Sequence, residues 1–318
     1  MSGNVIAITG GTGFVGRHLV KRLVDEGHRV RLLVRSQSAA QDLFADLDVE
    51  TAHGDLDNLQ ALRELTAGAG TVIHLASKIA AKDRAEFDTV NVDGTRNVAA
   101  AAQAAKVGQF IFISSLAARE AHLSGYAASK NKAEHELTQL TKYGTMPWVI
   151  LRPPAVYGPG DKATLPLLQA LTQKYALLPG RAEARFSLIY VEDLVDAIVA
   201  LIGDKETQSQ TIELDDGKEG GYDWPGLAKI AGEVGGQQVR PVFVPRTVLS
   251  AAAGAIEFGA KMVDKTPPLA RGKVQELYHP NWVCENKKLQ TAGTWAPKTR
   301  FSEGFKKTVD WYRSEGWL

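Results

Sequence analysis

The sequence predicts a doubly wound α/β fold, in which helices cover both faces of a parallel β-sheet, together with a smaller and mainly helical part. Three observations lead to this expectation. Short apolar runs alternate with amphipathic segments along the first half of the chain, a glycine-rich turn follows the first apolar run, and the alternation stops near residue 158. At 318 residues the chain is long for one domain, so we expect a large domain and a smaller one.

The first elements show the pattern most clearly. The run 4–9, NVIAIT, predicts a buried strand, and 14–27 predicts a helix because its apolar residues recur at helical spacing until Gly27. The same alternation of strand and helix then repeats. Strands are expected at 28–34, 71–76, 109–114 and 148–153, and helices at 39–47, 59–68, 91–108 and 126–144. Apolar strands separated by amphipathic helices indicate parallel pairing with right-handed crossovers.

Prolines and glycines interrupt this alternation over residues 153–160. The segment 187–203 predicts a short turn that runs into a helix, and 210–216 predicts a strand of the large domain. From there the composition shifts towards glycine, proline and tryptophan. We therefore assign residues 1–158 plus 186–216 to the large domain and residues 159–185 plus 217–318 to a substrate-binding region.

The composition limits the choice of partner. The formal charge is +1 and no basic patch is visible, so we expect a small-molecule partner and no nucleic acid. The single cysteine, Cys284, excludes an intrachain disulfide and thiolate metal sites, which fits the cytoplasm. No signal peptide is expected, and residues 247–263 are too short and too polar for a membrane span.

The turn after the first strand, AITGGTGFVG, predicts a dinucleotide site. Glycines let the main chain approach the phosphates, and the start of the following helix offers free N–H groups and a partial positive charge. Two registers are open: Gly11, Gly13 and Gly16 fit one glycine pattern, and Gly10, Gly13 and Gly16 fit another.

The end of the second strand bears on the choice of cofactor. An acidic residue there marks NAD, whereas this chain has Arg35 and Ser36. Since a guanidinium suits a phosphate, we expect NADP(H), with NAD(H) as the alternative.

Tyr126 and Lys130 predict acid–base chemistry. They lie four residues apart on one helix, so they are neighbours on its face. A nearby ammonium stabilises a tyrosinate and lowers the pKa of the phenol. Ser114 and Ser115 end the strand at 109–114, where a hydroxyl would meet the reacting oxygen.

Several motifs occur in order: TGGTGFVG, GD at 54–55, HLAS at 74–77, NVDGTRNV at 91–98, ISS at 113–115, YAASK and LRPPAVYGPGD. As a set they closely resemble the extended short-chain dehydrogenase/reductase superfamily, which has a Rossmann fold. Residues 266–313 resemble the 3β-hydroxysteroid dehydrogenase and dihydroflavonol reductase branch less closely.

The resemblance implies roles for individual residues. It makes Tyr126 the proton donor or acceptor, Lys130 its electrostatic partner and a ribose ligand, and Ser115 the hydroxyl that orients the substrate. It selects the glycine register with Gly10. Together with Arg35 and Ser36, which we expect at the 2′-phosphate from their position, the predicted cofactor contacts are Gly10, Thr12, Gly13, Phe14, Val15, Asp55, Leu56, Ala76, Tyr126, Lys130 and Pro153. Asn91 matches a mainly structural asparagine.

The expected activity is hydride transfer between the nicotinamide and a secondary alcohol or ketone, of steroid-like or flavonoid-like character. A sugar-nucleotide epimerase or dehydratase is the alternative, and a non-catalytic NADP-binding regulator or assembly factor is the third reading.

We expect His74 to be a packed or hydrogen-bonded residue, and the histidines and acids show no metal-ligand spacing. By analogy with the superfamily, the helices at 91–107 and 126–143 would build a homodimer.

Overall fold

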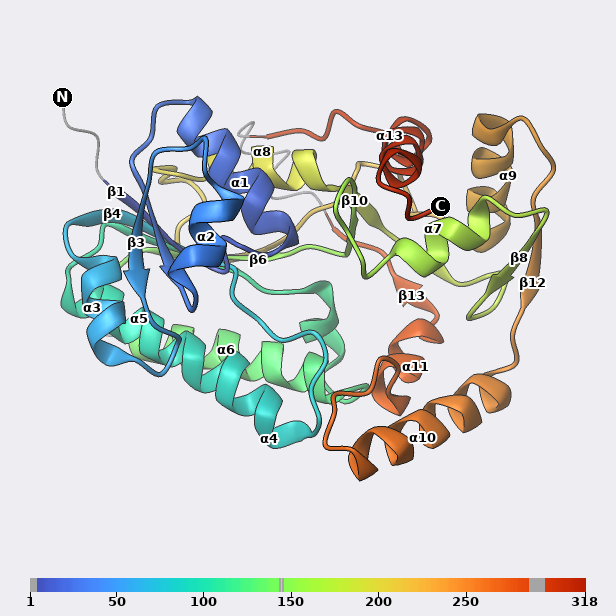
Figure 1. Cartoon of the computed structure of the whole chain (residues 1–318), viewed down its shortest axis with the longest axis horizontal. Coiled ribbons are helices and arrows are strands. Elements are labelled where there is room, and N and C mark those ends of the chain that lie inside the picture. The colour runs from blue at the N-terminus through green and yellow to red at the C-terminus, as the bar shows by residue number, and fades with distance from the viewer. Residues whose placement is uncertain (1–4, 143, 145, 286–294) are drawn as a thin grey trace. The chain divides into compact units, whose positions relative to one another are not determined.

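The computed structural model describes residues 5–142, 144, 146–285 and 295–318 (Figure 1). The chain forms two compact units. The first comprises Met1–Ala121, Gly125–Arg152 and Val195–Ile212, and the second comprises His122–Ser124, Pro153–Leu194 and Glu213–Leu318.

The first unit is built on a seven-stranded sheet in the order β11-β6-β5-β4-β1-β2-β3. Its strands are β1 (Val5–Thr9), β2 (Val30–Val34), β3 (Val49–His53), β4 (Ala69–His74), β5 (Gln109–Ile113), β6 (Trp148–Arg152) and β11 (Gln210–Glu213). Strands β1 to β6 pair in parallel. Successive strands progress from β1 to β3 in one direction and from β4 to β6 in the other. The order therefore reverses between β1 and β4, where α/β sheets bind their ligands.

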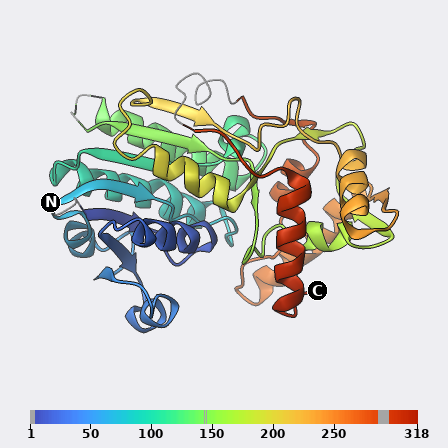
Figure 2. The same ribbon diagram turned by 90° about the horizontal axis from the view of Figure 1, so that it is seen from above.

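Helices cover both faces of this sheet. They are α1 (Phe14–Asp25), α2 (Gln37–Leu43), α3 (Leu59–Thr66), α4 (Arg84–Phe87), the π-helix η1 (Asp88–Asp93), α5 (Gly94–Ala104), the 3₁₀-helix η2 (Leu116–Glu120), α6 (Gly125–Thr141) and α8 (Val191–Ala200). Figures 1 and 2 show α3, α5 and α6 on one face and α1 on the other. An ion pair of 2.9 Å between Arg22 and Asp196 joins α1 to α8. Every residue of β1 and β5 is buried, as a doubly covered parallel sheet requires. The predicted fold class is confirmed.

Strand β3 is an element that the sequence analysis missed. Its residues alternate in polarity, and only Ala52 is buried. The strand lies at the edge of the sheet and pairs with β2 alone. A strand with one neighbour and little burial carries no apolar run, so the pattern used to find the other strands was absent.

The second unit contains five helices and six short strands among its described residues. They are β7 (Ala155–Tyr157), α7 (Leu165–Leu171), β8 (Tyr175–Leu178), β9 (Arg185–Phe186), β10 (Leu188–Tyr190), α9 (Trp224–Gly235), β12 (Arg240–Phe243), α10 (Arg246–Met262), α11 (Arg271–Leu277), β13 (Asn281–Trp282) and α13 (Phe301–Ser314). The strands form three parallel pairs that the sequence analysis did not predict. Aromatic rings of Tyr157, Tyr190 and Phe301 meet in the core.

Within the described part of the chain, every helix is too short or too polar to cross a bilayer.

Candidate active site

The turn between β1 and α1 uses glycine where a side chain would strike the main chain. Gly10 has a φ of +75°, and a Cβ there would lie 2.6 Å from the main-chain nitrogen of Ala76. A Cβ on Gly16 would lie 2.7 Å from the Cα of Gly11. At Gly11 the closest atom would be a side-chain methyl carbon of the buried Leu32, at 2.9 Å, and no main-chain atom is as close. The need for glycine therefore falls at Gly10 and Gly16, which favours the register that the resemblance selects.

The start of α1 fits a dinucleotide phosphate. Gly13 is its N-cap, no side chain accepts a hydrogen bond there, and the first turn contains no acidic residue. The N–H of Gly13 closes the turn on the carbonyl oxygen of Gly10 at 3.0 Å. An uncapped helix start with the positive end of its dipole binds anions, and the glycines allow close approach. Thr12 in this turn is exposed, whereas Phe14 and Val15 are half-buried.

Two arginines of the β2 region differ in what they contact. The guanidinium of Arg31 donates to a carboxylate oxygen of Glu50 at 2.7 Å and to the carbonyl oxygen of Ala67 at 2.7 Å, so it has a structural role. Arg35 is exposed and its side chain has no polar partner among the described residues. Ser36 caps α2 by accepting from the N–H of Ala39 at 3.3 Å. Arg35 is thus the guanidinium left available at the end of β2.

The loop after β3 is ordered by its own aspartate. Oδ1 of Asp55 accepts from the N–H groups of Asp57 and Asn58, both at 3.1 Å. Leu56 packs on Gly94 at the start of α5, where a Cβ would lie 2.6 Å from a methyl carbon of Leu56. These contacts fix the loop that carries Asp55 and Leu56 beside the carboxyl end of β3.

His74 is a structural residue. Its two ring nitrogens share hydrogen bonds with the hydroxyls of Thr9 at 2.6 Å and Thr95 at 2.9 Å. Burial lowers the pKa of this imidazole to about 3, and the charge of Lys130 acts in the same direction. His74 is therefore neutral and joins β4 to β1 and α5. Two residues later, the N–H of Ala76 donates to the hydroxyl of Thr9 at 3.3 Å, and this nitrogen lies where a side chain on Gly10 would strike it.

Asn91 holds the loop after β4. Its Oδ1 accepts from the N–H of Lys78 at 2.7 Å, and its Nδ2 donates to the carbonyl oxygen of Lys78 and to the hydroxyl of Ser129, both at 2.9 Å. The residue is buried within η1. This arrangement is a structural tie between the loop and α6.

Lys130 is buried at the carboxyl end of β5. It is 1% exposed, and its Nζ donates to the carbonyl oxygen of Ile113 at 2.9 Å. The ring centroid of Phe112 lies 4.4 Å from the same nitrogen. Burial lowers the pKa of Lys130 to about 7, and the carboxylate of Glu134 opposes this shift. The ammonium is thereby held at a fixed point next to the end of the strand.

Tyr126 and Ser115 lie close to that point along the chain. Tyr126 precedes Lys130 by one turn of α6, is half-buried, and has the ring of Phe87 at 6.2 Å. Ser115 follows Ile113 by two residues and accepts from the N–H of Ala117 at 3.2 Å. The hydroxyl hydrogen of Ser115 has no acceptor among the described residues, so it remains available to a substrate oxygen.

The sequence analysis missed an ionic cluster beside Lys130. Arg152 at the end of β6 holds Glu134 of α6 with two bonds, Nε to Oε1 at 2.9 Å and Nη2 to Oε2 at 2.6 Å. The hydroxyl of Ser114 donates to Oε1 of Glu134 at 2.5 Å. The spacing of Tyr126, Lys130 and Glu134, each one turn apart, was the available signal. The bidentate contact with Arg152 fixes the carboxylate of Glu134 one turn beyond Lys130. This carboxylate raises the pKa of Lys130.

Pro153 is the predicted cofactor contact that these interactions do not include. It belongs to the second compact unit, whereas the other predicted residues belong to the first.

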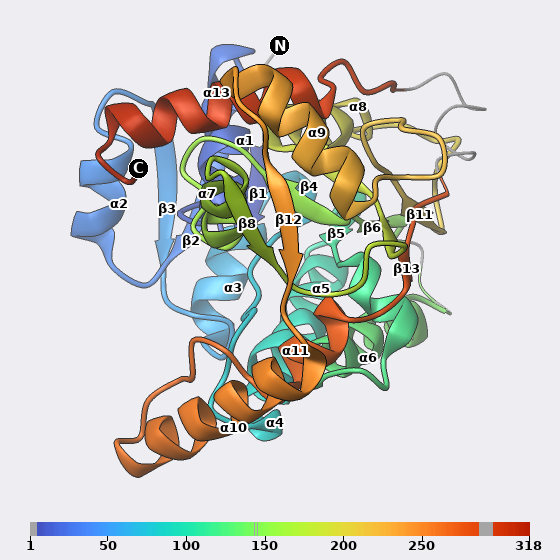
Figure 3. The same ribbon diagram turned by 90° about the vertical axis from the view of Figure 1, so that its right-hand side faces the viewer.

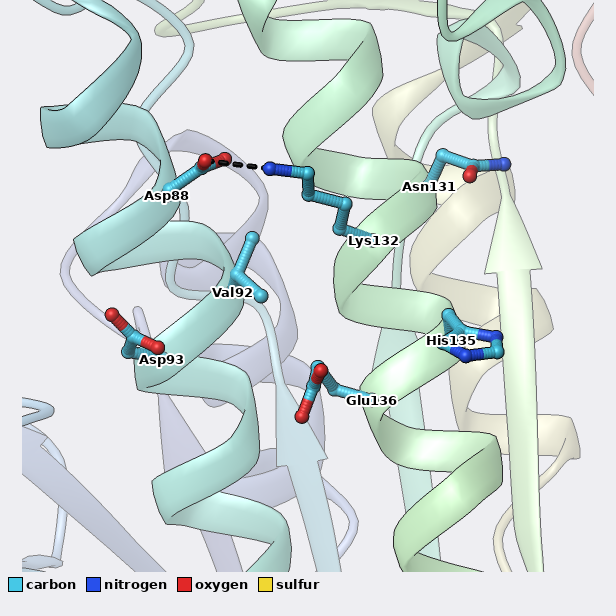
Figure 4. Close-up of a pocket in the computed structure, with 7 residues that line it drawn as sticks. All are labelled: Asp88, Val92, Asp93, Asn131, Lys132, His135 and Glu136. Carbon is cyan, nitrogen blue, oxygen red and sulfur yellow. Dashed lines mark hydrogen bonds and ion pairs between the residues drawn. The ribbon is translucent and has the colours of Figure 1, made fainter.

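A polar groove of about 500 Å³ lies elsewhere on the first unit, between η1 and α6 (Figure 4). Its lining residues are Asp88, Val92, Asp93, Asn131, Lys132, His135 and Glu136. Lys132 reaches across to Asp88 with an ion pair of 2.7 Å. The groove occupies the exposed side of α6 and includes none of the predicted site residues.

Across residues 5–142, 144, 146–285 and 295–318, no group of three histidine, cysteine, aspartate or glutamate side chains is placed to hold a metal ion.

The reversal point of the sheet, the glycine turn and the buried lysine define a nucleotide-dependent enzyme of the short-chain dehydrogenase/reductase type. Residues 6–214 match the NAD dependent epimerase/dehydratase family. The chain belongs to this family and is an NAD(P)-dependent oxidoreductase, which confirms the resemblance found in the sequence.

Relatives span much or all of the chain. A ceramide reductase of Caulobacter vibrioides is 38% identical over 315 residues, which cover 99% of this chain and 96% of that protein. A UDP-glucose 4-epimerase of Vibrio cholerae is 33% identical over 67% of this chain and 71% of its own length. The crystal structure of a UDP-glucose 4-epimerase from Thermotoga maritima shares the fold, with a TM-score of 0.75 at 19% identity over 98% of this chain and 99% of that one.

Proposed function

We propose that this protein is an NADP(H)-dependent ketone reductase that interconverts a ketone and a secondary alcohol on an apolar, long-chain molecule. The observation that carries the proposal is the position of Lys130. Its ammonium donates to the carbonyl oxygen of Ile113, the last residue of β5, and Ser115 follows Ile113 by two residues. Tyr126 precedes Lys130 by one turn of the same helix.

Each side chain has a distinct task in the reduction. Tyr126 donates its phenolic proton to the substrate carbonyl oxygen, and the phenolate is stabilised by the ammonium of Lys130. Ser115 donates a hydrogen bond to the same oxygen and orients the carbonyl group. When bound, the nicotinamide supplies the hydride that completes the alcohol at the carbonyl carbon. Tyr126 regains its proton from water.

The preference for NADP(H) over NAD(H) rests on Arg35. Its guanidinium lies at the end of β2, where an acid would mark NAD, and no described side chain engages it. Ser36 lies beside it at the start of α2. Arg35 and Ser36 would bind the 2′-phosphate, and the turn from Gly10 to Val15 would bind the pyrophosphate. Asp55, Leu56, Ala76 and Pro153 complete the proposed contacts.

The substrate class is supported by the ceramide reductase of Caulobacter vibrioides. That relative matches nearly the whole of both chains, so the similarity includes the region to which we assign substrate binding. Steroid-like and flavonoid-like ketones belong to the same apolar class.

The similarity to a UDP-glucose 4-epimerase favours a second candidate, an epimerase or dehydratase of sugar nucleotides. Such a substrate needs cations for its diphosphate. In the second unit Arg185 pairs with Asp223 at 3.2 Å and Arg271 with Glu257 at 3.7 Å, so each of these two guanidiniums already has a carboxylate partner. A non-catalytic regulator would not need Tyr126, Lys130 and Ser115 together.

We extend the proposal to organisation and location. Residues 1–158 plus 186–216 would bind the dinucleotide, and residues 159–185 plus 217–318 the substrate. The exposed sides of α5 and α6, with the groove of Figure 4, would pair in a homodimer. The dependence on NADPH and the single cysteine fit an enzyme of the cytoplasm.

The direct test follows cofactor absorbance with purified protein, NADPH or NADH, and a panel of long-chain, steroid and flavonoid ketones. Oxidation of NADPH that depends on an apolar ketone supports the proposal. Conversion of a UDP-sugar without net change in cofactor absorbance would establish the epimerase, which recycles its hydride.

A further inference from the structure

Helix α10 exposes a continuous apolar stripe. The residues at helical spacing that face solvent are Val248, Ala251, Ala252, Ala255, Phe258, Gly259 and Met262. The exposed fractions of the large side chains are 57% for Val248, 70% for Phe258 and 73% for Met262. Val263, which ends the helix, is 61% exposed. Large apolar side chains gathered on one face of a helix indicate a binding surface.

The opposite side of α10 is already occupied. Ala253 is buried, and a Cβ on Gly254 would lie 2.9 Å from Nε of Arg271 in α11. Glu257 accepts from the N–H of Arg271 at 2.9 Å. Figures 1 and 3 show α10 (orange) at the outer edge of the second unit, with α11 beside it. The packing of α10 within its unit therefore does not account for the exposed stripe.

The charges around the stripe select its occupant. Arg246 begins the helix, and Lys261 and Lys265 lie at its other end, all exposed. Asp264 is the one exposed acid beside them, and Glu257 is engaged by Arg271. A second copy of α10 would bring positive charges together in either orientation. Antiparallel pairing would place Arg246 beside the two lysines of the other copy, and parallel pairing would place Arg246 beside Arg246 and lysines beside lysines. An anionic surface meets both ends favourably.

We propose that α10 docks on the surface of an anionic lipid bilayer, with its stripe among the acyl chains and its cations at the headgroups. This is the geometry of an amphipathic helix that lies in the membrane interface without crossing it. Docking of α10 would bring the enzyme to a substrate that is dissolved in the membrane, and this role of the docking rests on the proposed function. The docking itself does not, because it requires neither cofactor nor turnover.

The test is sedimentation of the purified full chain with vesicles. One set contains phosphatidylcholine alone, and the other contains phosphatidylcholine with phosphatidylglycerol. We expect stronger binding to the anionic vesicles and weaker binding as salt screens the cations. The double change Phe258→Ser and Met262→Ser should lower the partition coefficient about tenfold or more, because two exposed side chains lose their apolar contact with lipid.

Two further variants locate the effect. Leu177→Ser removes a side chain of β8 that is 64% exposed and should leave binding unchanged. Lys261→Glu with Lys265→Glu should remove the preference for anionic vesicles. Thermal unfolding midpoints equal to that of the unchanged protein verify that the variants fold.

Three results would overturn the proposal. The first is an unchanged protein that stays in solution with both kinds of vesicle. The second is a Phe258 and Met262 variant that binds as well as the unchanged protein. The third is a dimer in solution that this variant converts to a monomer, which would make a second copy the occupant. An unchanged protein that reduces ketones without binding vesicles would refute the docking alone. An unchanged protein that binds vesicles without reducing ketones would refute the proposed reaction alone.

Discussion

The Nζ of Lys130 donates a hydrogen bond of 2.9 Å to the main-chain carbonyl oxygen of Ile113, which ties α6 to the carboxyl end of β5. The nitrogen is buried and lies over the ring of Phe112. Its position is therefore set by the sheet, and Tyr126, one turn earlier on the same helix, is carried with it. This tie places the proposed acid–base pair within the first unit.

Replacing Tyr126 by phenylalanine should remove the proton donor while keeping the ring. We expect ketone reduction to fall by about 10²- to 10⁴-fold, since that is the usual contribution of a general acid. NADPH affinity, measured by fluorescence titration, should be unchanged because the phosphate turn is untouched. Retained turnover would show that another group supplies the proton.

The pH profile of reduction should report the state of Lys130. Burial lowers the pKa of this lysine to about 7, so its ammonium is present below that pH and is lost as the pH rises through it. We expect the rate to fall on that alkaline side, because the neutral amine no longer stabilises the phenolate of Tyr126.

Glu134 raises the pKa of Lys130, so Glu134→Gln should lower that pKa and move the falling limb of the profile to lower pH. The matched control is Glu136→Gln, which makes the same change in charge on the half-exposed side of α6. The kcat profile against pH is the measurement. Equal profiles for the two variants would mean that Glu134 serves only the structure.

Arg35 should decide between the two cofactors. Loss of a charge-assisted contact typically weakens binding by about tenfold to a hundredfold, so Arg35→Ala should raise the dissociation constant of NADPH by that factor. The value for NADH should stay the same, because it lacks the 2′-phosphate. Arg63→Ala, at another exposed arginine of the first unit, is the control. Similar affinities of the unchanged protein for NADPH and NADH would contradict the role given to Arg35.

Gly16→Ala should damage both the cofactor site and the fold. The added Cβ meets the main chain of Gly10 and Gly11, and we expect a loss of about 1–3 kcal/mol in the free energy of unfolding together with loss of NADPH binding. Gly235→Ala, in α9, meets nothing closer than 3.9 Å and should stabilise the protein by roughly 0.5–1 kcal/mol. Chemical denaturation of both variants measures the contrast, and equal effects would remove the steric argument.

The sequence by itself determined the doubly wound fold and the glycine turn. Each strand from β1 to β6 except β3 appears as an apolar run, because a doubly covered parallel strand must be apolar throughout. The turn at Gly10 is readable because a positive φ and a close main chain exclude other residues. Tyr126 and Lys130 were found through spacing within a single helix, and their catalytic roles stay predictions.

Only the tertiary structure decided what these residues touch. The cluster of Ser114, Glu134 and Arg152 joins a strand end, a helix and another strand, and no local pattern links positions so far apart in sequence. The stripe on α10 is a second case. Phe258 and Met262 have the spacing of ordinary core residues. Only the burial of Ala253 and the contact of Glu257 with Arg271 in α11 show that they face outwards. Periodicity specifies the faces of an element, but which face is buried depends on neighbours that are distant in the chain.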